Sequence, residues 1–249
     1  MIARSQHEGV LTLRMAHGKA SALDVELLDA LARELDGAAE DVRALVLTGT
    51  GSIFSAGVDL FRLTQEGAEY VRRFLPLLCR FVRMLFTFPR PVVAAVNGHA
   101  IAGGCVIVLA CDIRLMAEGA GRIGLPELLV GVPFPAAALE VVRFAVPPDN
   151  VQSLLYTGQT LRPQEALAAG LVDEVVAPAN LLARAREIAG QLAQIPPQVY
   201  RLTKQSLRAP ALERIERASE LQDREALEMW AAAETRAHVR DYLRRTLGK

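Results

Sequence analysis

Residues 97–112 read NGHAIAGGCVIVLACD, a nearly uncharged run with two adjacent glycines in the middle of a chain of 249 residues. Such a run is typical of a buried core element, of a membrane span, or of a helix start that holds negative charge. Its apolar part extends only from Ala100 to Cys111 before Asp112 and Arg114 interrupt it, which is short of the ~20 residues that cross a bilayer. A membrane span is therefore excluded.

The glycine pair at Gly103 and Gly104 is expected to open a helix that follows a strand ending near Asn97. The first turn of a helix presents N–H groups without intrahelical partners, and glycine allows a ligand to approach them closely. In apolar surroundings such a helix start suits the stabilisation of a developing oxyanion. Tight packing of the helix against a strand explains the two glycines equally well.

The composition describes a folded chain without a general affinity for polyanions. Apolar residues make up 51% of the sequence, and 28 basic residues balance 28 acidic ones. The chain can therefore bury one large core or two modest ones, and no basic field attracts nucleic acid or anionic lipid. We predict neither a nucleic-acid partner nor a membrane partner.

The three cysteines, Cys79, Cys105 and Cys111, form no C-x-x-C pair, which indicates reduced thiols in a reducing compartment. The first residues, MIARSQHEGVL, have no apolar signal region, so we predict a cytoplasmic protein. The four histidines are scattered and no acidic pair brackets them, so no metal site is predicted.

Short apolar runs alternate with helical patterns, which predicts an α/β fold. Strands are expected over residues 9–15, 44–48, 91–96, 112–118 and 171–176. A helix with leucines on one face is expected to open at a capping box formed by Ser21 and Asp24. Further helices are expected over residues 136–146, 150–156, 163–169, 181–192, 197–207 and 212–247. The runs at 44–48 and 91–96 are continuous, which is typical of strands buried on both faces.

The segment TGTGSIFSAGVDL, residues 48–60, lies between those two strands. Its glycine spacing does not fit a dinucleotide-binding fingerprint, and it lacks the G-K-S/T ending of a phosphate-binding loop. Taken alone it reads as a connecting loop.

Several spaced motifs together resemble the crotonase superfamily, the enoyl-CoA hydratases and isomerases. They are FSAGVDL at 54–60, PVVAAVNGHAIAGGCVIVLACDIRLMAE at 91–118, IGLPELLVGV at 123–132, TGQTLRPQEALAAGLVDEVV at 157–176 and LTKQSLR at 202–208. The resemblance is collinear from about Gly9 to Arg208. It implies an α/β spiral of ββα repeats with an acyl-CoA site over residues 1–195, and a C-terminal helical oligomerisation region over 196–249.

The resemblance also implies the ligand and the assembly. The substrate is expected to be an acyl-CoA thioester, with coenzyme A as part of the substrate and no separate cofactor. The C-terminal helices are expected to join subunits into a homotrimer or a homohexamer. Apolar residues such as Trp230 and Leu243 among the charges of 212–247 are consistent with subunit contacts.

By motif position, the backbone N–H groups of Val58 and Gly103 are expected to hold the thioester oxygen. The resemblance implies a set of substrate-contacting residues: Ala20, Ala22, Ser55, Ala56, Val58, Asp59, Leu60, Gly103 and Lys204. Lys204 is a candidate contact for the CoA phosphates, and an exposed helical lysine is its alternative interpretation.

The acidic residues discriminate between reactions. Hydratases of the family use two glutamates; here the first position holds Val106 and the second holds Glu127. Pro135 occupies the position of the acid that dienoyl isomerases and dehalogenases use. A single carboxylate can carry a proton from C2 to C4 of one bound enolate. The sequence thus predicts an enoyl-CoA isomerase of fatty acid metabolism with Glu127 as proton shuttle. A hydratase, which is a lyase of β-oxidation, and a catalytically silent acyl-CoA-binding member are the alternatives.

Other polar residues of these motifs are given structural roles. Asp59, Asp112 and Arg114 are expected to form salt bridges or turn hydrogen bonds. His99 is expected to pack in the core or to support the site residues, and not to take part in catalysis. Glu127 itself has an alternative interpretation as a solvated cap, but its apolar flanks favour a partly desolvated carboxylate with raised proton affinity.

Overall fold

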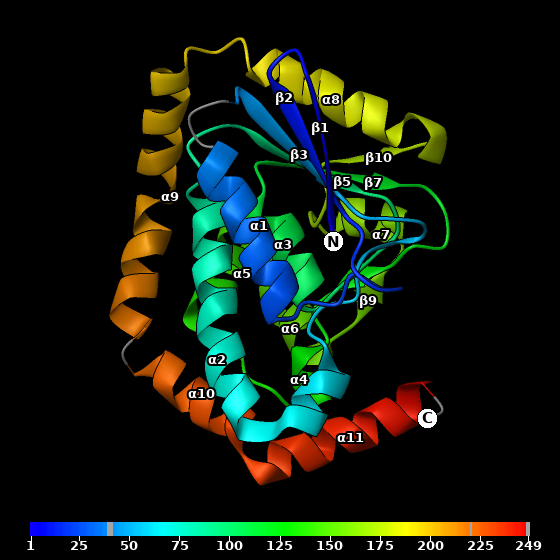
Figure 1. The fold of residues 1–249 in the computed structure, drawn as a ribbon, viewed down its shortest axis with the longest axis vertical. Coiled ribbons are helices and arrows are strands. Elements are labelled where there is room, and N and C mark those ends of the chain that lie inside the picture. The colour runs from blue at the N-terminus through cyan, green and yellow to red at the C-terminus, as the bar shows by residue number, and fades with distance from the viewer. Residues whose placement is uncertain (39–41, 220, 248–249) are drawn as a thin grey trace.

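The computed structural model describes residues 1–38, 42–219 and 221–247, which form two sheets surrounded by helices (Figure 1). The six-stranded sheet has the order β1 (Ile2–His7), β2 (Val10–Met15), β3 (Ala44–Thr48), β5 (Val92–Val96), β7 (Ile113–Ala117), β10 (Glu174–Val176). The smaller sheet has the order β4 (Ile53–Ser55), β6 (His99–Ile101), β8 (Ile123–Gly124), β9 (Thr160–Leu161). The first helices are α1 (Val25–Ala38), α2 (Leu60–Phe86), α3 (Gly103–Ala110), α4 (Glu127–Val130) and α5 (Ala136–Ala145). They are followed by α6 (Pro148–Thr157), α7 (Pro163–Ala168), a 3₁₀ turn (Pro178–Asn180), α8 (Leu181–Leu192), α9 (Pro197–Ser219), α10 (Gln222–Ala231) and α11 (Ala233–Leu247).

The core is a repeated unit of two strands and a helix. A strand of the large sheet is followed by a short strand of the small sheet and then by a helix, as β3–β4–α2, β5–β6–α3 and β7–β8–α4. Strands β3, β5 and β7 pair in parallel, and so do β4, β6 and β8. Successive units therefore stack side by side, and this confirms the predicted α/β spiral of ββα repeats.

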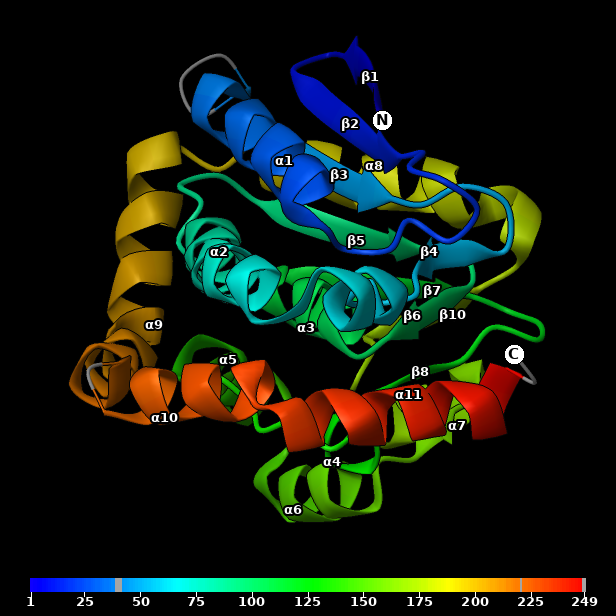
Figure 2. The same cartoon turned by 60° about the horizontal axis from the view of Figure 1, so that its bottom comes forward.

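The continuous apolar runs form the centre of the large sheet, as predicted. On β3, Leu45 and Leu47 belong to the main core, whereas Ala44 and Val46 pack in a second cluster with α8. Because helices cover both faces of the sheet, alternate side chains on either face are buried, and the strand needs no polar positions. Figure 2 shows α8 on one side of this sheet and α1 on the other.

Helix α1 begins differently from the prediction. The backbone N–H of Leu27 donates to Asp24 Oδ1 at 2.7 Å, so Asp24 caps this helix. Ser21 lies further upstream with a φ of 43°, outside the helix. The predicted capping box between Ser21 and Asp24 is therefore wrong.

The C-terminal residues do not form the single stretch predicted over 212–247. They are the end of α9, then α10, then α11, with an extended residue, Ala232, between the last two helices. Helix α9 packs on α5, whereas α10 and α11 pack on α2 and run along one side of the core (Figure 2). The division of the chain at residue 195 stays a prediction. In the part of the chain that the structure describes, no helix combines the length and apolar character needed to span a membrane.

Candidate active site

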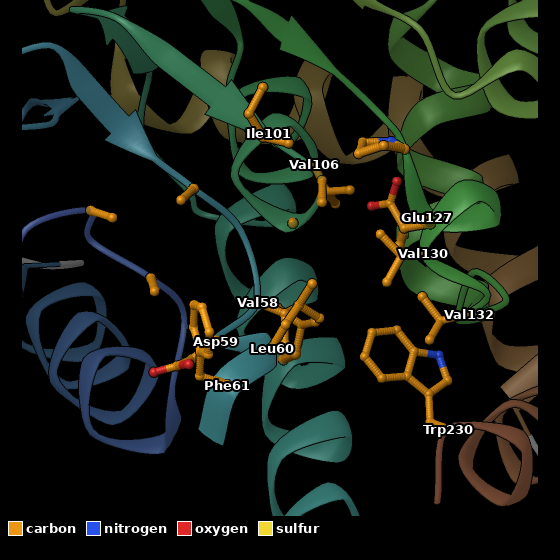
Figure 3. A pocket seen from close by; sticks show the side chains of 18 of the residues that line it. Val58, Asp59, Leu60, Phe61, Ile101, Val106, Glu127, Val130, Val132 and Trp230 are labelled. Carbon is orange, nitrogen blue, oxygen red and sulfur yellow. The ribbon is translucent and has the colours of Figure 1, made fainter. Parts of the chain in front are cut away.

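Three predicted residues lie at equivalent places of three successive repeats. Val58 lies between β4 and α2, Gly103 opens α3 directly after β6, and Glu127 opens α4 after β8. Because β4, β6 and β8 are parallel neighbours, their carboxyl ends meet at one edge of the small sheet. The three residues consequently line one cavity of about 770 Å³ (Figure 3).

The Val58 amide is aimed by the pairing of its neighbours with Leu23. Leu23 N donates to Gly57 O at 2.7 Å, and Asp59 N donates to Leu23 O at 3.0 Å. In this parallel bridge the flanking groups point toward Leu23, and the N–H of Val58 points away from it. Among the residues that the structure describes, this N–H has no hydrogen-bond acceptor.

The Gly103 amide is the first N–H of α3, where no intrahelical acceptor exists. A Cβ built on Gly103 would lie 4.0 Å from the Val58 nitrogen, so the two amides are close together. Ala102, directly before it, has a φ of 51° and a ψ of −124°, a conformation that alanine rarely adopts. The strained backbone of Ala102 thus lies beside the two neighbouring amides of Val58 and Gly103. No group in the described chain accepts a hydrogen bond from the Gly103 N–H.

Two other glycines allow α3 and the segment after β4 to approach closely enough to bring the amides of Val58 and Gly103 together. A Cβ on Gly57, which has a φ of 81°, would lie 2.5 Å from Ile101 O. A Cβ on Gly104 would lie 2.5 Å from Ser55 O. Any side chain at either position would push α3 away from the segment that carries Val58. Close packing therefore explains Gly104, and ligand access at Gly103 stays a prediction.

Glu127 is a buried carboxyl group with one oxygen that has no hydrogen-bond partner among the described residues. The residue is only 7% exposed, and the unpaired oxygen is Oε2. Burial raises the pKa of Glu127 to about 8, an increase that its own backbone amide only partly opposes. The carboxylate points toward the side chain of Val106 in Figure 3.

Val106 faces the cavity because it lies one helical turn after Gly103 on the same face of α3. It is 2% exposed and presents two methyl groups where a second acid would stand. Asp59 is the other carboxylate that lines the cavity within the described chain. Its Oδ1 accepts from Arg62 N at 3.0 Å as the N-cap of α2, which agrees with a structural role.

Much of the remaining wall of the cavity is apolar, and part of the wall comes from the C-terminal helices. Val130, Val132 and Phe134 follow Glu127, and Trp230 faces them from α10. Trp230 Nε1 donates to Pro133 O at 2.9 Å, which fixes the indole against this wall. Tyr242, Leu243 and Thr246 add a contribution from α11. The sequence pattern gave no signal for this contribution, because it depends on how α10 and α11 fold back.

Most of the predicted substrate-contacting residues meet at the cavity. Those that line it are Ala20, Ala22, Ala56, Val58, Asp59, Leu60 and Gly103, and the predicted proton shuttle Glu127 lines it with them. Ser55 does not: it is fully buried, its hydroxyl donates to Ser21 O at 2.8 Å and accepts from Gly57 N at 3.2 Å. Ser55 therefore holds the loop before Val58 and does not line the cavity.

Lys204 is also absent from the cavity, contrary to the interpretation of it as a phosphate contact. It is 7% exposed, and Nζ donates to Asp112 Oδ2 at 2.8 Å and to Arg90 O at 3.2 Å. Arg208 donates to Asp112 Oδ1 at 2.7 Å and lies over the Phe86 ring. We call Asp112, Lys204 and Arg208 the Asp112 cluster; it fastens α9 to the core.

Two basic residues at the cavity mouth were not predicted. Lys19 is exposed there, and His17 Nε2 lies 2.6 Å from Asp24 Oδ2. The position of Lys19 directly before the predicted contact residues Ala20 and Ala22 could have identified it from the sequence. His99 also lines the cavity, and Arg114 pairs with Asp173, as its structural interpretation requires. Histidine, cysteine and acidic side chains form no group of three or more that could hold a metal ion in the described ranges.

The family model described as enoyl-CoA hydratase/isomerase matches residues 5–246. The chain belongs to the enoyl-CoA hydratase/isomerase family. Among its relatives in this family is a putative enoyl-CoA hydratase of Thermus thermophilus, 42% identical over 193 residues that cover 75% of each chain. A crystal structure of a probable enoyl-CoA hydratase from Mycobacterium tuberculosis is 32% identical, with a TM-score of 0.84 over 90% of this chain and 95% of that one. The human mitochondrial Δ3-Δ2-enoyl-CoA isomerase has the same fold, with a TM-score of 0.94 at 24% identity over 99% and 98% of the two chains.

Proposed function

We propose that this protein is an enoyl-CoA isomerase that shifts the double bond of a 3-enoyl-CoA to the 2-position. The observation that carries the proposal is the lone buried carboxylate of Glu127, which points toward Val106 and not toward a second acid. Membership of the enoyl-CoA hydratase/isomerase family supports an acyl-CoA thioester as the substrate.

The thioester oxygen is assigned to the two unpaired amides of Val58 and Gly103. Removal of a proton from C2 gives an enolate, whose negative charge develops on that oxygen. Two preorganised N–H donors in a cavity with apolar walls stabilise this charge by several kcal/mol, on the order of 3 kcal/mol for one donor. Because the donors belong to the backbone, valine can occupy position 58 without loss of the interaction.

Glu127 is assigned both proton transfers. As a carboxylate it takes the C2 proton, which leaves the electron pair delocalised over C2, C3, C4 and the thioester oxygen. The resulting carboxylic acid then returns the proton to C4, and the double bond ends between C2 and C3. A pKa of about 8 suits this task, since a proton carrier works best when its pKa lies near the operating pH.

Hydration is the second candidate function, and the names of relatives such as the Thermus thermophilus protein favour it. Addition of water requires one group that activates the water and another that supplies a proton. The apolar side chain of Val106 can do neither. A catalytically silent acyl-CoA-binding protein is the third candidate. This candidate does not explain why the carboxyl group of Glu127 is buried at the cavity with an unpaired oxygen.

The CoA end of the substrate is assigned to the polar mouth of the cavity. His17 and the exposed residues Gly18 and Lys19 line the cavity there, whereas Val130, Val132 and Phe134 supply apolar lining. The exposed ammonium of Lys19 replaces Lys204 as the contact for the CoA phosphates, because the Asp112 cluster already holds Lys204.

Assembly into a homotrimer or homohexamer also stays a proposal. Trp230, Val239 and Leu243 are buried within the subunit itself, so they do not supply the contact surface. Val199, Leu202 and Leu207 on the outer face of α9 are exposed and can do so. Sedimentation at micromolar concentration is expected to show a trimer or hexamer, and a monomer would contradict the proposal.

The function is tested by comparing two reactions of the purified protein. Conversion of 3-enoyl-CoA to 2-enoyl-CoA is expected to be much faster than hydration of 2-enoyl-CoA of the same chain length. A faster hydration would overturn the isomerase assignment in favour of the hydratase. Absence of both reactions, with acyl-CoA binding retained, would favour the silent member.

A further inference from the structure

A second cavity of about 720 Å³ adjoins the catalytic cavity, and the two cavities share two lining residues. It is bounded by α2, α5, α9 and α10, and Cys79 and Pro135 line both cavities. Cys79 belongs to α2, and Pro135 directly precedes α5. The boundary between the two spaces therefore includes one small side chain and one proline ring.

Cys79 makes this boundary apolar. Burial raises the pKa of its thiol to about 12, so the side chain is neutral at physiological pH. A neutral thiol behaves as a small apolar group, and the adjoining catalytic cavity is apolar at the same place, with Leu78, Val82 and Ala138. A hydrocarbon chain that passes Cys79 and Pro135 meets no polar group that it would have to desolvate.

The second cavity combines apolar walls with positive charge. Leu75, Met84, Ile215 and Leu227 line it together with Arg80, Arg83 and Arg224. Arg83 lies 3.8 Å from Glu216, and Asp223 accepts the N–H of Ala136 at 2.7 Å. Arg80 and Arg224 are exposed and have no ion-pair partner among the residues that the structure describes. Two guanidinium groups are thus available to an anion that reaches this cavity.

We propose that the second cavity receives the distal end of a long acyl chain that passes Cys79 and Pro135, and that Arg80 and Arg224 bind a carboxylate at that end. The preferred substrates are then thioesters of long ω-carboxyacyl chains. This inference rests on the proposed function for the placement of the thioester beside Val58 and Gly103. The shared boundary favours the substrate's own tail over an unrelated anion, because such an anion would need no connection to the catalytic cavity.

Binding of saturated thioesters tests the inference without any turnover. Isothermal titration calorimetry is performed with hexanoyl-CoA, dodecanoyl-CoA and dodecanedioyl-CoA, the last two having equal length. Dodecanedioyl-CoA is expected to bind roughly 3- to 5-fold more tightly than dodecanoyl-CoA, the range for an ion pair at a solvated rim. The double variant Arg80→Gln/Arg224→Gln is expected to abolish this difference, whereas Arg73→Gln, an exposed arginine on the same helix, is expected to keep it.

Narrowing the boundary tests the route. Cys79→Leu is expected to weaken both long ligands relative to hexanoyl-CoA, which serves as the internal reference for folding and thioester binding. Equal affinities of the two long ligands in the unmodified protein, or a preference that survives the double arginine variant, would overturn the inference. Equal weakening of all three ligands by Cys79→Leu would overturn the route. If the unmodified protein shows the expected affinities for the three ligands but does not catalyse isomerisation, the result counts against the proposed function and not against this inference.

Discussion

Glu127 and Asp112 are both nearly buried carboxylates, yet the chain surrounds them differently. Asp112 accepts hydrogen bonds from Lys204, Arg208 and the backbone N–H of Val92. Glu127 has an oxygen with no partner, in a cavity with apolar walls. Burial alone therefore does not identify a functional acid. A carboxylate whose hydrogen bonds are all made fastens segments together, whereas a buried one with an unpaired oxygen is a candidate for proton exchange.

The largest expected effect comes from Glu127→Gln, which keeps the shape of the side chain and removes its basicity. Isomerisation is expected to fall by roughly 10²- to 10⁴-fold, the usual contribution of a positioned acid or base. Acyl-CoA affinity is expected to stay near that of the unmodified protein, because the amides of Val58 and Gly103 are untouched. Steady-state kinetics and calorimetric binding measure the two quantities.

Glu140→Gln is the matched control for this change. Glu140 is as buried as Glu127 but is paired with Arg143 and Arg214, and it does not line the cavity. Its substitution is expected to affect stability and not turnover. Near-normal turnover by Glu127→Gln would show that another group carries the proton.

Asp112→Asn is expected to have the next largest effect, on stability. The variant leaves two buried cations without their carboxylate, which costs about 3 kcal/mol in the free energy of unfolding. Asp173→Asn, which breaks the more exposed pair with Arg114, is expected to cost at most about 1 kcal/mol. Denaturant unfolding of both variants provides the measurement, and equal costs would show that burial of the Asp112 cluster has no energetic weight.

A smaller effect is expected from pH, through the free energy of unfolding. Burial raises the pKa of Glu127 from 4.5 to about 8, so between these values the folded state holds a proton that the unfolded state has lost. The stabilisation is complete below pH 4.5 and is lost as the pH rises through 8. Between pH 6 and pH 8 the unmodified protein is expected to lose about 2 kcal/mol relative to Glu127→Gln.

The same titration is expected in the kinetics, with kcat/KM for isomerisation rising as the pH approaches 8, because the carboxylate must be free to take the C2 proton. Parallel stability curves for the unmodified protein and Glu127→Gln over this range would mean that Glu127 is ionised throughout.

Val106→Glu is expected to give the smallest effect. A second carboxylate facing Glu127 supplies the group that water activation lacks, and the ratio of hydration to isomerisation is expected to rise about 10-fold. The substitution also replaces a buried methyl surface with an acid, which lowers stability. Val106→Gln controls for size and polarity without adding a base, and an equal rise in that variant would contradict the role given to the acid.

The strands of the core could be predicted because their signal is local. Residues 44–48 and 91–96 are apolar at every position, and the structure buries both faces of each. The extent of the long helix α2 could not be predicted, because Gly67 has a non-helical conformation within it and Pro76 interrupts its pattern. The capping residue of α1 was misassigned because Ser21 and Asp24 both have side chains that can cap a helix.

The site residues follow the same division. Val58, Gly103 and Glu127 were located by their positions in the motifs alone. The short strands β4, β6 and β8 that precede them in the structure were not among the predicted strands. Lys204 could not be interpreted correctly from sequence, since its partner Asp112 lies 92 residues earlier. Leu243 reaches the cavity only because the chain turns at Ala232, and no local pattern encodes where the last helix then lies.

The use of backbone amides at Val58 and Gly103 has a consequence for how the activity can be inherited and lost. No substitution at position 58, other than proline, deletes its N–H, so random mutation has no direct way to remove this donor. The vulnerable positions are Gly57 and Gly104, where any side chain collides with Ile101 O or Ser55 O. In the proposed function, the oxygen-binding half of the site then depends on glycines that do not line the cavity, whereas the acid half can be changed by a single substitution such as Val106→Glu. A lineage can therefore exchange one reaction for another and keep the same enolate holder.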